Sequence, residues 1–219
     1  MTGVSQQCEG GMLHLIKIPR KYGVQVAKTA ERALVQAGEL FAYRKPVEVV
    51  VFSSYPEVVI PELGIAGKSI YEGDIVIDID FSRKDIPHVI NKELPSTLLH
   101  EFSHIVREAT VGYGKTLLGA LISEGIGSYV ENKLLRRTMP YTKPIRHELK
   151  YWQKAKRFLG KKTYNHFEWF FGRGKLPRWI GYRLGYLLVD SFMQRQENLS
   201  LEQLVRIKSH EVLRAFPIS

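Results

Sequence analysis

The chain has 219 residues, of which 44% are hydrophobic and 25% charged, a composition typical of folded globular proteins and unlike that of disordered chains. Its single cysteine, Cys8, excludes an intramolecular disulfide framework and any zinc finger that needs several cysteines, so a metal ion would require histidine and carboxylate ligands. The sequence begins without a basic, apolar leader and contains no apolar run of membrane-spanning length, so we expect a soluble, cytoplasmic protein that does not associate with membranes.

The net charge of +10 is concentrated in one region. Residues 133–183 contain 15 Lys or Arg against two Glu, a balance of +13, so the remaining 168 residues sum to −3. Tryptophan, tyrosine and phenylalanine residues are interleaved with these basic residues. Two interpretations stay open: a solvated helical face, or a surface that binds an acidic polypeptide, nucleic acid or anionic lipid.

The first part of the chain predicts a small sheet with one helix. Strands are expected at residues 12–18 and at the β-branched run 47–52, and the spacing of apolar residues predicts an amphipathic helix over 21–41. Residues 67–80 predict a hairpin that turns at Glu72 and Gly73. Its second arm alternates apolar and acidic residues, which favours an outer strand with one exposed face.

From residue 93 onward the pattern is helical. Five helices are predicted: 95–108 with Pro95 in its first turn, 116–137, 145–159, 176–196, and one capped by Ser200. The expected fold class is α+β, a small N-terminal mixed sheet with helices followed by a mainly helical part. We expect an α/β subdomain at residues 1–92 and a helical subdomain at 93–219, within one compact domain. Residues 1–11, polar and containing glycine, predict a flexible tail or a segment that covers a cleft.

The most specific chemical pattern is HEFSH at residues 100–104. His100 and His104 lie four residues apart and therefore project from the same stripe of a helix, where both can bind one ion. Glu101 lies next to that stripe and can reach a water molecule at the metal without replacing it. This is the position of the general base in zinc hydrolases, so the motif indicates zinc-assisted hydrolysis.

A catalytic zinc ion needs a third protein ligand and one open position. Glu124 is a candidate, because the 19 residues between it and His104 allow the chain to return on an antiparallel helix. Its neighbours are apolar, so a carboxylate there would be costly unless it were paired or bound to a cation. Glu108 is an alternative on the same helix as His104, but three ligands from a single helix give poor tetrahedral geometry.

Three segments, HEFSH at 100–104, ISEGIGSYVE at 122–131 and IGYRLGYLLVDSF at 180–192, resemble in order and spacing the YjaZ-like family of predicted zinc-dependent proteases. That family is similar to the gluzincin clan, which includes thermolysin, and the resemblance covers about residues 60–195. It implies Zn²⁺ held by His100, His104 and Glu124, with Glu101 as the base. It also implies a strand beside the zinc helix to which a peptide adds, and DIVIDID at 74–80 is the candidate.

One position departs from the thermolysin pattern. Four residues after the third ligand, where thermolysin-like enzymes usually carry an aspartate that orients a histidine, this chain has Ser128. The resemblance therefore does not indicate which residue orients the histidine ligands in this chain.

The expected function is that of a zinc metallopeptidase of the gluzincin type, a hydrolase in which metal-activated water attacks a peptide bond and Glu101 accepts the proton. A further donor must stabilise the oxyanion, and the resemblance favours Tyr182 over Tyr186, Arg183 and His166. The alternative is a non-catalytic module of the same fold that binds nucleic acid or another anionic partner through residues 133–183. A structural zinc site is a third interpretation, although the motifs offer no fourth ligand.

Overall fold

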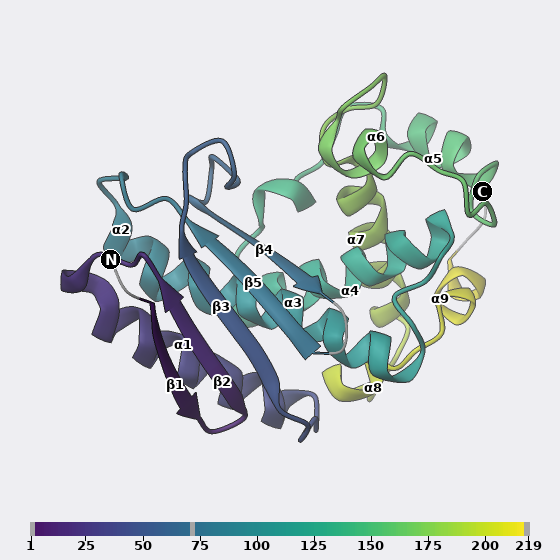
Figure 1. Ribbon diagram of the computed structural model, residues 1–219. Coiled ribbons are helices and arrows are strands. Elements are labelled where there is room, and N and C mark those ends of the chain that lie inside the picture. Colours follow the sequence, from purple (N-terminus) through teal and green to yellow (C-terminus); the bar gives the residue numbers. More distant parts are fainter. Residues whose placement is uncertain (1–2, 71–72, 217–219) are drawn as a thin grey trace. The chain divides into compact units, whose positions relative to one another are not determined.

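The computed structural model describes residues 3–70 and 73–216 (Figure 1). The chain divides into two compact units, Met1–Val106 and Arg107–Ser219. All strands of the described residues lie in the first unit, and the second is helical. The predicted α+β class, a small mixed sheet followed by a mainly helical part, is confirmed. The subdomain boundary expected between residues 92 and 93 stays a prediction.

The first unit contains a five-stranded mixed sheet in the order β1-β2-β3-β5-β4 (Figure 1). Strands β2, β3 and β5 run parallel, whereas β1 and β4 are antiparallel to their neighbours at the two edges. The β-branched run predicted as a strand is the central one, consistent with burial on a pleated surface. The strands are β1 (Val4–Cys8), β2 (Gly11–Ile16), β3 (Val47–Ser53), β4 (Ile65–Ile70) and β5 (Asp74–Ile79).

Two predictions about this sheet are wrong. Strand β5, which contains all of DIVIDID except Asp80, pairs with β3 on one side and β4 on the other, so it is not an edge strand. Its alternation of apolar and acidic residues reflects one covered and one open face of the sheet. Residues 4–8 of the expected tail form β1, paired with β2. The predicted turn at Glu72 and Gly73 lies partly outside the described residues, because Glu72 does.

Helices cover one face of the sheet (Figure 1). Inward side chains such as Leu13, Val49 and Ile77 are fully buried. Helix α1 (Arg20–Leu40) buries most of the apolar stripe that its sequence spacing predicts, but Val24 at the start of that stripe is 69% exposed. Two short elements, α2 (Ile86–His88) and the π-helical turn η2 (Val89–Glu93), lead into helix α3 (Leu94–Thr110). Edge strand β4 lies against α3, because a Cβ added at Gly67 would come within 2.7 Å of Cγ of Glu101.

Helices α4 (Leu117–Leu135) and α7 (Ile180–Met193) form the centre of the second unit, and they cross at glycines. A Cβ added at Gly125 would lie 2.3 Å from the carbonyl oxygen of Gly185, and one added at Gly185 would lie 2.0 Å from that of Leu121. The two helix backbones therefore touch, which only glycine permits. Around them lie η3 (Pro140–Thr142), α5 (Glu148–Lys156), α6 (His166–Phe171), α8 (Leu201–Val205) and α9 (Ser209–Ala215).

The five predicted helices correspond to α3, α4, α5, α7 and α8, and Ser200 forms a capping box at the start of α8. Sequence analysis missed β1, α6 and α9. Within the described part of the chain, no helix has both the length and the apolar character needed to cross a membrane.

Replacing Gly185 by alanine is expected to lower the free energy of unfolding by about 3 kcal/mol, because the added methyl group would overlap the backbone of α4. Gly23→Ala is the matched control, since Gly23 also lies in a helix and its added Cβ would meet nothing within 4 Å. Alanine there should stabilise the protein by about 0.5–1 kcal/mol. Urea unfolding of both variants measures the difference, and equal stabilities would contradict the close crossing.

Candidate metal centre

Helix α3 presents the two histidines of HEFSH on one stripe. The ring centroids of His100 and His104 lie 4.8 Å apart with an angle of 81° between the ring planes, and the two residues are only 6% and 4% exposed. The stripe is buried because the apolar residues between and beside the histidines, such as Phe102, belong to the core. Two imidazoles one turn apart can therefore converge on one ion in a largely dry environment.

Glu101 lies between the two histidines in sequence and against the edge of the sheet. It is 7% exposed, and Gly67 of β4 is the residue that it approaches. Any side chain at position 67 would collide with Glu101, so the glycine allows the strand and the carboxylate to lie close together. The geometry places a buried carboxylate beside the backbone of an edge strand.

Glu124 lies on α4 and is 6% exposed. The hydroxyl group of Tyr113, in the turn before α4, donates a hydrogen bond to its Oε1. Burial raises the pKa of the Tyr113 phenol well above its usual value, and the charge of Glu124 and this hydrogen bond raise it further. The phenol is therefore a permanent donor at neutral pH. Sequence analysis missed Tyr113; its only signal was an aromatic residue between two glycines in a short connection.

A buried arginine supports the Tyr113 turn. Arg107 is fully buried, and its Nε donates to Oγ of Ser123 at 2.9 Å. Its Nη1 donates to the carbonyl oxygens of Val205 at 3.1 Å and Ile207 at 3.0 Å. Burial lowers the pKa of Arg107 to about 10, so the guanidinium still carries its charge at neutral pH.

Ser123 connects Arg107 to the turn that contains Tyr113. Its hydroxyl donates to the carbonyl oxygen of Tyr113 at 2.6 Å while it accepts from Arg107. Because Ser123 directly precedes Glu124, one network fixes both the backbone beside the carboxylate and the turn that carries its hydrogen-bond donor. Glu108, the alternative ligand, is exposed and accepts a hydrogen bond from the backbone N–H of Tyr113 at 2.7 Å, so it stabilises the same turn.

His100, His104 and Glu124 together could hold a metal ion. Each offers one ligand atom, and these atoms all lie within 4.8 Å of one another. Within the described residues this is the only such group of three. Two imidazole nitrogens and one carboxylate oxygen are the ligand set of catalytic zinc sites that keep a fourth position open. The chemistry of these donors therefore fits zinc.

The oxyanion candidates on α7 have different neighbours. The ring of Tyr182 lies 5.1 Å from that of Tyr141, and the negative charge of a Tyr182 phenolate would raise the pKa of Tyr113, which shows that the two are within electrostatic range. Tyr186 lies beside Tyr129, with 6.4 Å between ring centroids. Tyr182 is therefore close enough to the partner of Glu124 for its charge to affect the pKa of that partner.

Arg183 and Glu148 form a nearly buried ion pair. Nε of Arg183 donates to Oε2 of Glu148 at 2.6 Å, and Nη1 donates to the carbonyl oxygen of Thr142 at 2.9 Å. The hydrogen bond from Arg183 lowers the pKa of Glu148. Arg183 thus ties η3 and α5 to α7, a structural task that occupies its guanidinium.

His166 begins α6, where its ring stacks on Phe170 with 4.5 Å between centroids. Burial lowers the pKa of His166, and the negative charge of Glu124 opposes that effect. Burial also raises the pKa of Tyr164, and Glu124 adds to it. Both residues therefore lie within electrostatic range of Glu124, and sequence analysis did not single out Tyr164.

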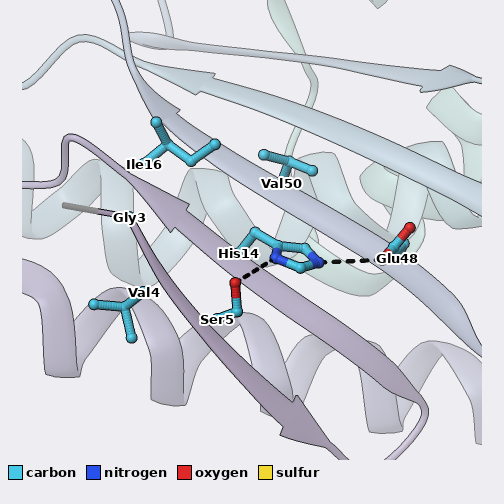
Figure 2. Close-up of a pocket in the computed structure, with 7 residues that line it drawn as sticks. All are labelled: Gly3, Val4, Ser5, His14, Ile16, Glu48 and Val50. Carbon is cyan, nitrogen blue, oxygen red and sulfur yellow. Dashed lines mark hydrogen bonds and ion pairs between the residues drawn. The ribbon is translucent and has the colours of Figure 1, made fainter.

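Three hydrogen-bonded polar side chains lie in a shallow hollow on the open face of the sheet, apart from the candidate metal centre (Figure 2). Oγ of Ser5 is 2.7 Å from Nδ1 of His14, whose Nε2 is 3.2 Å from Oε1 of Glu48. These residue types occur in nucleophilic triads, but the Glu48 side chain is 53% exposed and so cannot hold the histidine rigidly. We interpret these three hydrogen-bonded side chains as a structural link across β1, β2 and β3.

Comparison with known proteins gives one family. The sequence profile of a family described as predicted Zn-dependent protease (DUF2268) matches residues 26–214, most of the chain. The match confirms the family that HEFSH and the two later segments suggested, and it leaves out β1 and β2. A search among curated proteins found no match.

Proposed function

Because this chain belongs to the family of predicted Zn-dependent proteases (DUF2268), we propose that it is a zinc metallopeptidase of the gluzincin type that hydrolyses peptide bonds. The observation that carries the proposal is the buried group His100, His104 and Glu124, whose ligand atoms lie within 4.8 Å of one another, with Glu101 beside it. The proposal also places the protein in the cytoplasm.

His100, His104 and Glu124 would hold the zinc ion and leave one position open, which favours a catalytic over a structural site. When bound, zinc supplies a Lewis acid that polarises the peptide carbonyl and lowers the pKa of water. The remaining tasks of the reaction fall to side chains and backbone groups of this protein.

Glu101 is the proposed general base. Its carboxylate accepts a proton from the attacking water as oxygen bonds to the carbonyl carbon, and it then delivers that proton to the amine nitrogen as the C–N bond breaks. The site supports this role because Glu101 is buried next to the ligand stripe yet is not a member of the ligand group.

Strand β4 is the proposed binding site for the peptide backbone. One side of β4 pairs with β5, and the other side pairs with Ile60 only at its first residue, Ile65, so the rest of this last strand can pair with an extended peptide. Its Gly67 approaches Glu101, so a peptide paired with β4 would run beside the base.

Tyr182 is the proposed oxyanion donor, since a phenol donates a hydrogen bond without bringing a charge. Support comes from its electrostatic interaction with Tyr113, the hydrogen-bond donor to Glu124. His166 is the second candidate because Glu124 acts on it directly.

Tyr113→Phe is expected to weaken zinc binding about 10- to 100-fold, because it removes the hydrogen bond that orients the carboxylate of Glu124. Competition with a fluorescent zinc chelator measures the affinity. Tyr129→Phe is the control, since Tyr129 is a partly buried tyrosine of α4 whose ring lies beside that of Tyr186. Equal affinities for the two variants would contradict the orienting role of Tyr113.

Digestion of a peptide library tests the proposed activity. The purified protein should cleave a subset of the peptides, lose this activity on treatment with a zinc chelator, and regain it when one equivalent of Zn²⁺ is restored. Cleavage that survives complete removal of metal, or no cleavage by the zinc-loaded protein, would contradict the proposal.

A further inference from the structure

Helix α6 exposes two phenylalanines. Phe167 is 54% exposed and Phe171 is 42% exposed, and their ring centroids lie 5.8 Å apart, as expected for side chains one turn apart. The opposite side of the helix, with Trp169 and Phe170, is buried. An exposed pair of large apolar rings on a packed helix is unfavourable in water, which indicates a surface that contacts another molecule.

The segment after α6, residues 172–179, folds back on the helix. The backbone N–H of Arg173 donates to the carbonyl oxygen of Phe167 at 3.1 Å, and that of Lys175 donates to Oε1 of Glu168 at 3.2 Å. The guanidinium carbon of Arg173 lies 5.3 Å from the ring centroid of Phe167. Cationic and aromatic groups are thus held together in advance, which lowers the entropy lost on binding.

The part of the sequence that contains the aromatic pair is strongly positive. Residues 143–178 contain eleven Lys or Arg and two Glu, Glu148 and Glu168. Glu148 is paired with Arg183, and the carboxylate of Glu168 accepts a hydrogen bond from the backbone N–H of Lys175. An uncompensated positive field of this kind attracts anionic groups.

Helix packing connects α6 to the metal ligand on α4. The ring of Phe170 lies so close to α7 that a Cβ added at Gly181 would be 2.7 Å from it. One turn further along α7, Gly185 touches the backbone of Gly125, the residue that follows Glu124. Two glycine contacts therefore bring α6 and α4 onto the same short stretch of α7.

Side chains bridge the remaining gap between the aromatic pair and Glu124. The ring of Phe171 lies 5.8 Å from that of His166 and 6.5 Å from that of Tyr182. His166 in turn is within electrostatic range of Glu124. Phe171 therefore lies beside both His166 and Tyr182, the two candidates for the oxyanion donor.

We propose that Phe167 and Phe171 bind a large apolar side chain of the substrate, and that Arg173 and Lys175 select substrates with Asp or Glu next to it. This inference rests on the proposed function and names the substrate class of the same site. An apolar side chain placed against the two rings loses its contact with water, and neighbouring carboxylates gain charge-assisted hydrogen bonds. An acidic peptide is favoured over nucleic acid because Phe171 lies beside His166 and Tyr182, the two candidates for the oxyanion donor in peptide hydrolysis.

Fluorescence anisotropy of short labelled peptides tests the inference. The probe peptide has a single Phe flanked by Asp residues; one comparison peptide replaces Asp by Lys and another replaces Phe by Ala. Binding is measured to the zinc-loaded Glu101→Gln protein, so that the peptide is not consumed. Two double variants are made in this Glu101→Gln background. The aromatic double variant carries Phe167→Ala and Phe171→Ala, and the basic double variant carries Arg173→Gln and Lys175→Gln. The controls are Leu149→Ala, another strongly exposed apolar residue, and Lys28→Gln, an exposed lysine on α1.

The aromatic double variant should bind the probe about tenfold more weakly and should no longer distinguish it from the Ala peptide. The basic double variant should lose the preference for Asp over Lys and much of the salt dependence of binding. Both controls should match the parent protein. Unchanged affinity in the aromatic double variant overturns the inference. The inference is also overturned if the protein binds single-stranded DNA more tightly than the probe peptide and the same substitutions weaken that binding. The surface would then be a nucleic-acid site.

Cleavage of the same peptides by the wild-type protein separates this inference from the proposed function. Equal cleavage of all three peptides would leave the peptidase in place and overturn the substrate class. A binding preference for the probe with no cleavage by the zinc-loaded protein would support the peptide surface and overturn the peptidase.

Discussion

Glu101→Gln is expected to lower kcat for a cleaved peptide about a thousandfold while zinc remains bound. The amide of glutamine has nearly the same shape as the carboxylate but cannot accept a proton from water, and the loss of a positioned general base typically costs about 10²- to 10⁴-fold. Because Glu101 is not in the ligand group, the metal content should stay the same. Steady-state kinetics and elemental analysis of the same samples measure the two quantities.

Glu108→Gln is the control for this substitution. Glu108 lies on the same helix but is exposed and accepts a hydrogen bond from a backbone N–H, so its variant should keep most of the activity. A Glu101→Gln protein as active as the wild type would exclude Glu101 as the base. Loss of zinc together with activity would instead make Glu101 a ligand.

His104→Ala is expected to weaken zinc binding about a thousandfold and to abolish cleavage. If the three ligands contribute similar shares of a binding free energy of about 12 kcal/mol, removal of one costs about 4 kcal/mol, or about three powers of ten. Chelator competition gives the affinity. His210→Ala is the control, because His210 is exposed on α9. Zinc affinity in His104→Ala equal to that of the control would show that the metal binds elsewhere.

Local sequence patterns predicted the elements that carry the chemistry. The helical spacing around HEFSH gives α3 and the common stripe of His100 and His104, and the apolar neighbours of Glu124 indicate its buried place on α4. These features depend on periodicity and on residue type, which are readable from a single chain. The ligand roles of the three residues stay a prediction until metal is measured.

Features that depend on distant parts of the chain were not predictable in the same way. Whether DIVIDID is central or at an edge depends on the strand order, in which β3 pairs with β5 although β4 lies between them in sequence. The contact between Gly125 and Gly185 joins residues that no local pattern connects. Helix α6 is short and rich in aromatic residues on all sides, so its sequence has no amphipathic period to recognise.

Tyr113 shows a third kind of limit. Its hydroxyl reaches Glu124 because the turn between α3 and α4 is fixed by Ser123, and Arg107 in turn fixes Ser123 through carbonyl groups at the end of α8. Such a network is assembled from side chains that are unremarkable one at a time. Only the folded geometry reveals that they act on one carboxylate.

Zinc K-edge X-ray absorption of the purified, zinc-loaded protein tests the central claim most directly. We expect one zinc ion per chain, with two imidazole nitrogens and a mixture of carboxylate and water oxygens at about 2.0–2.2 Å. In Glu124→Ala, where only the third ligand is removed, the two imidazoles should remain and an oxygen should be lost or replaced by water. A sulfur ligand, a single imidazole, or no bound zinc would contradict the account.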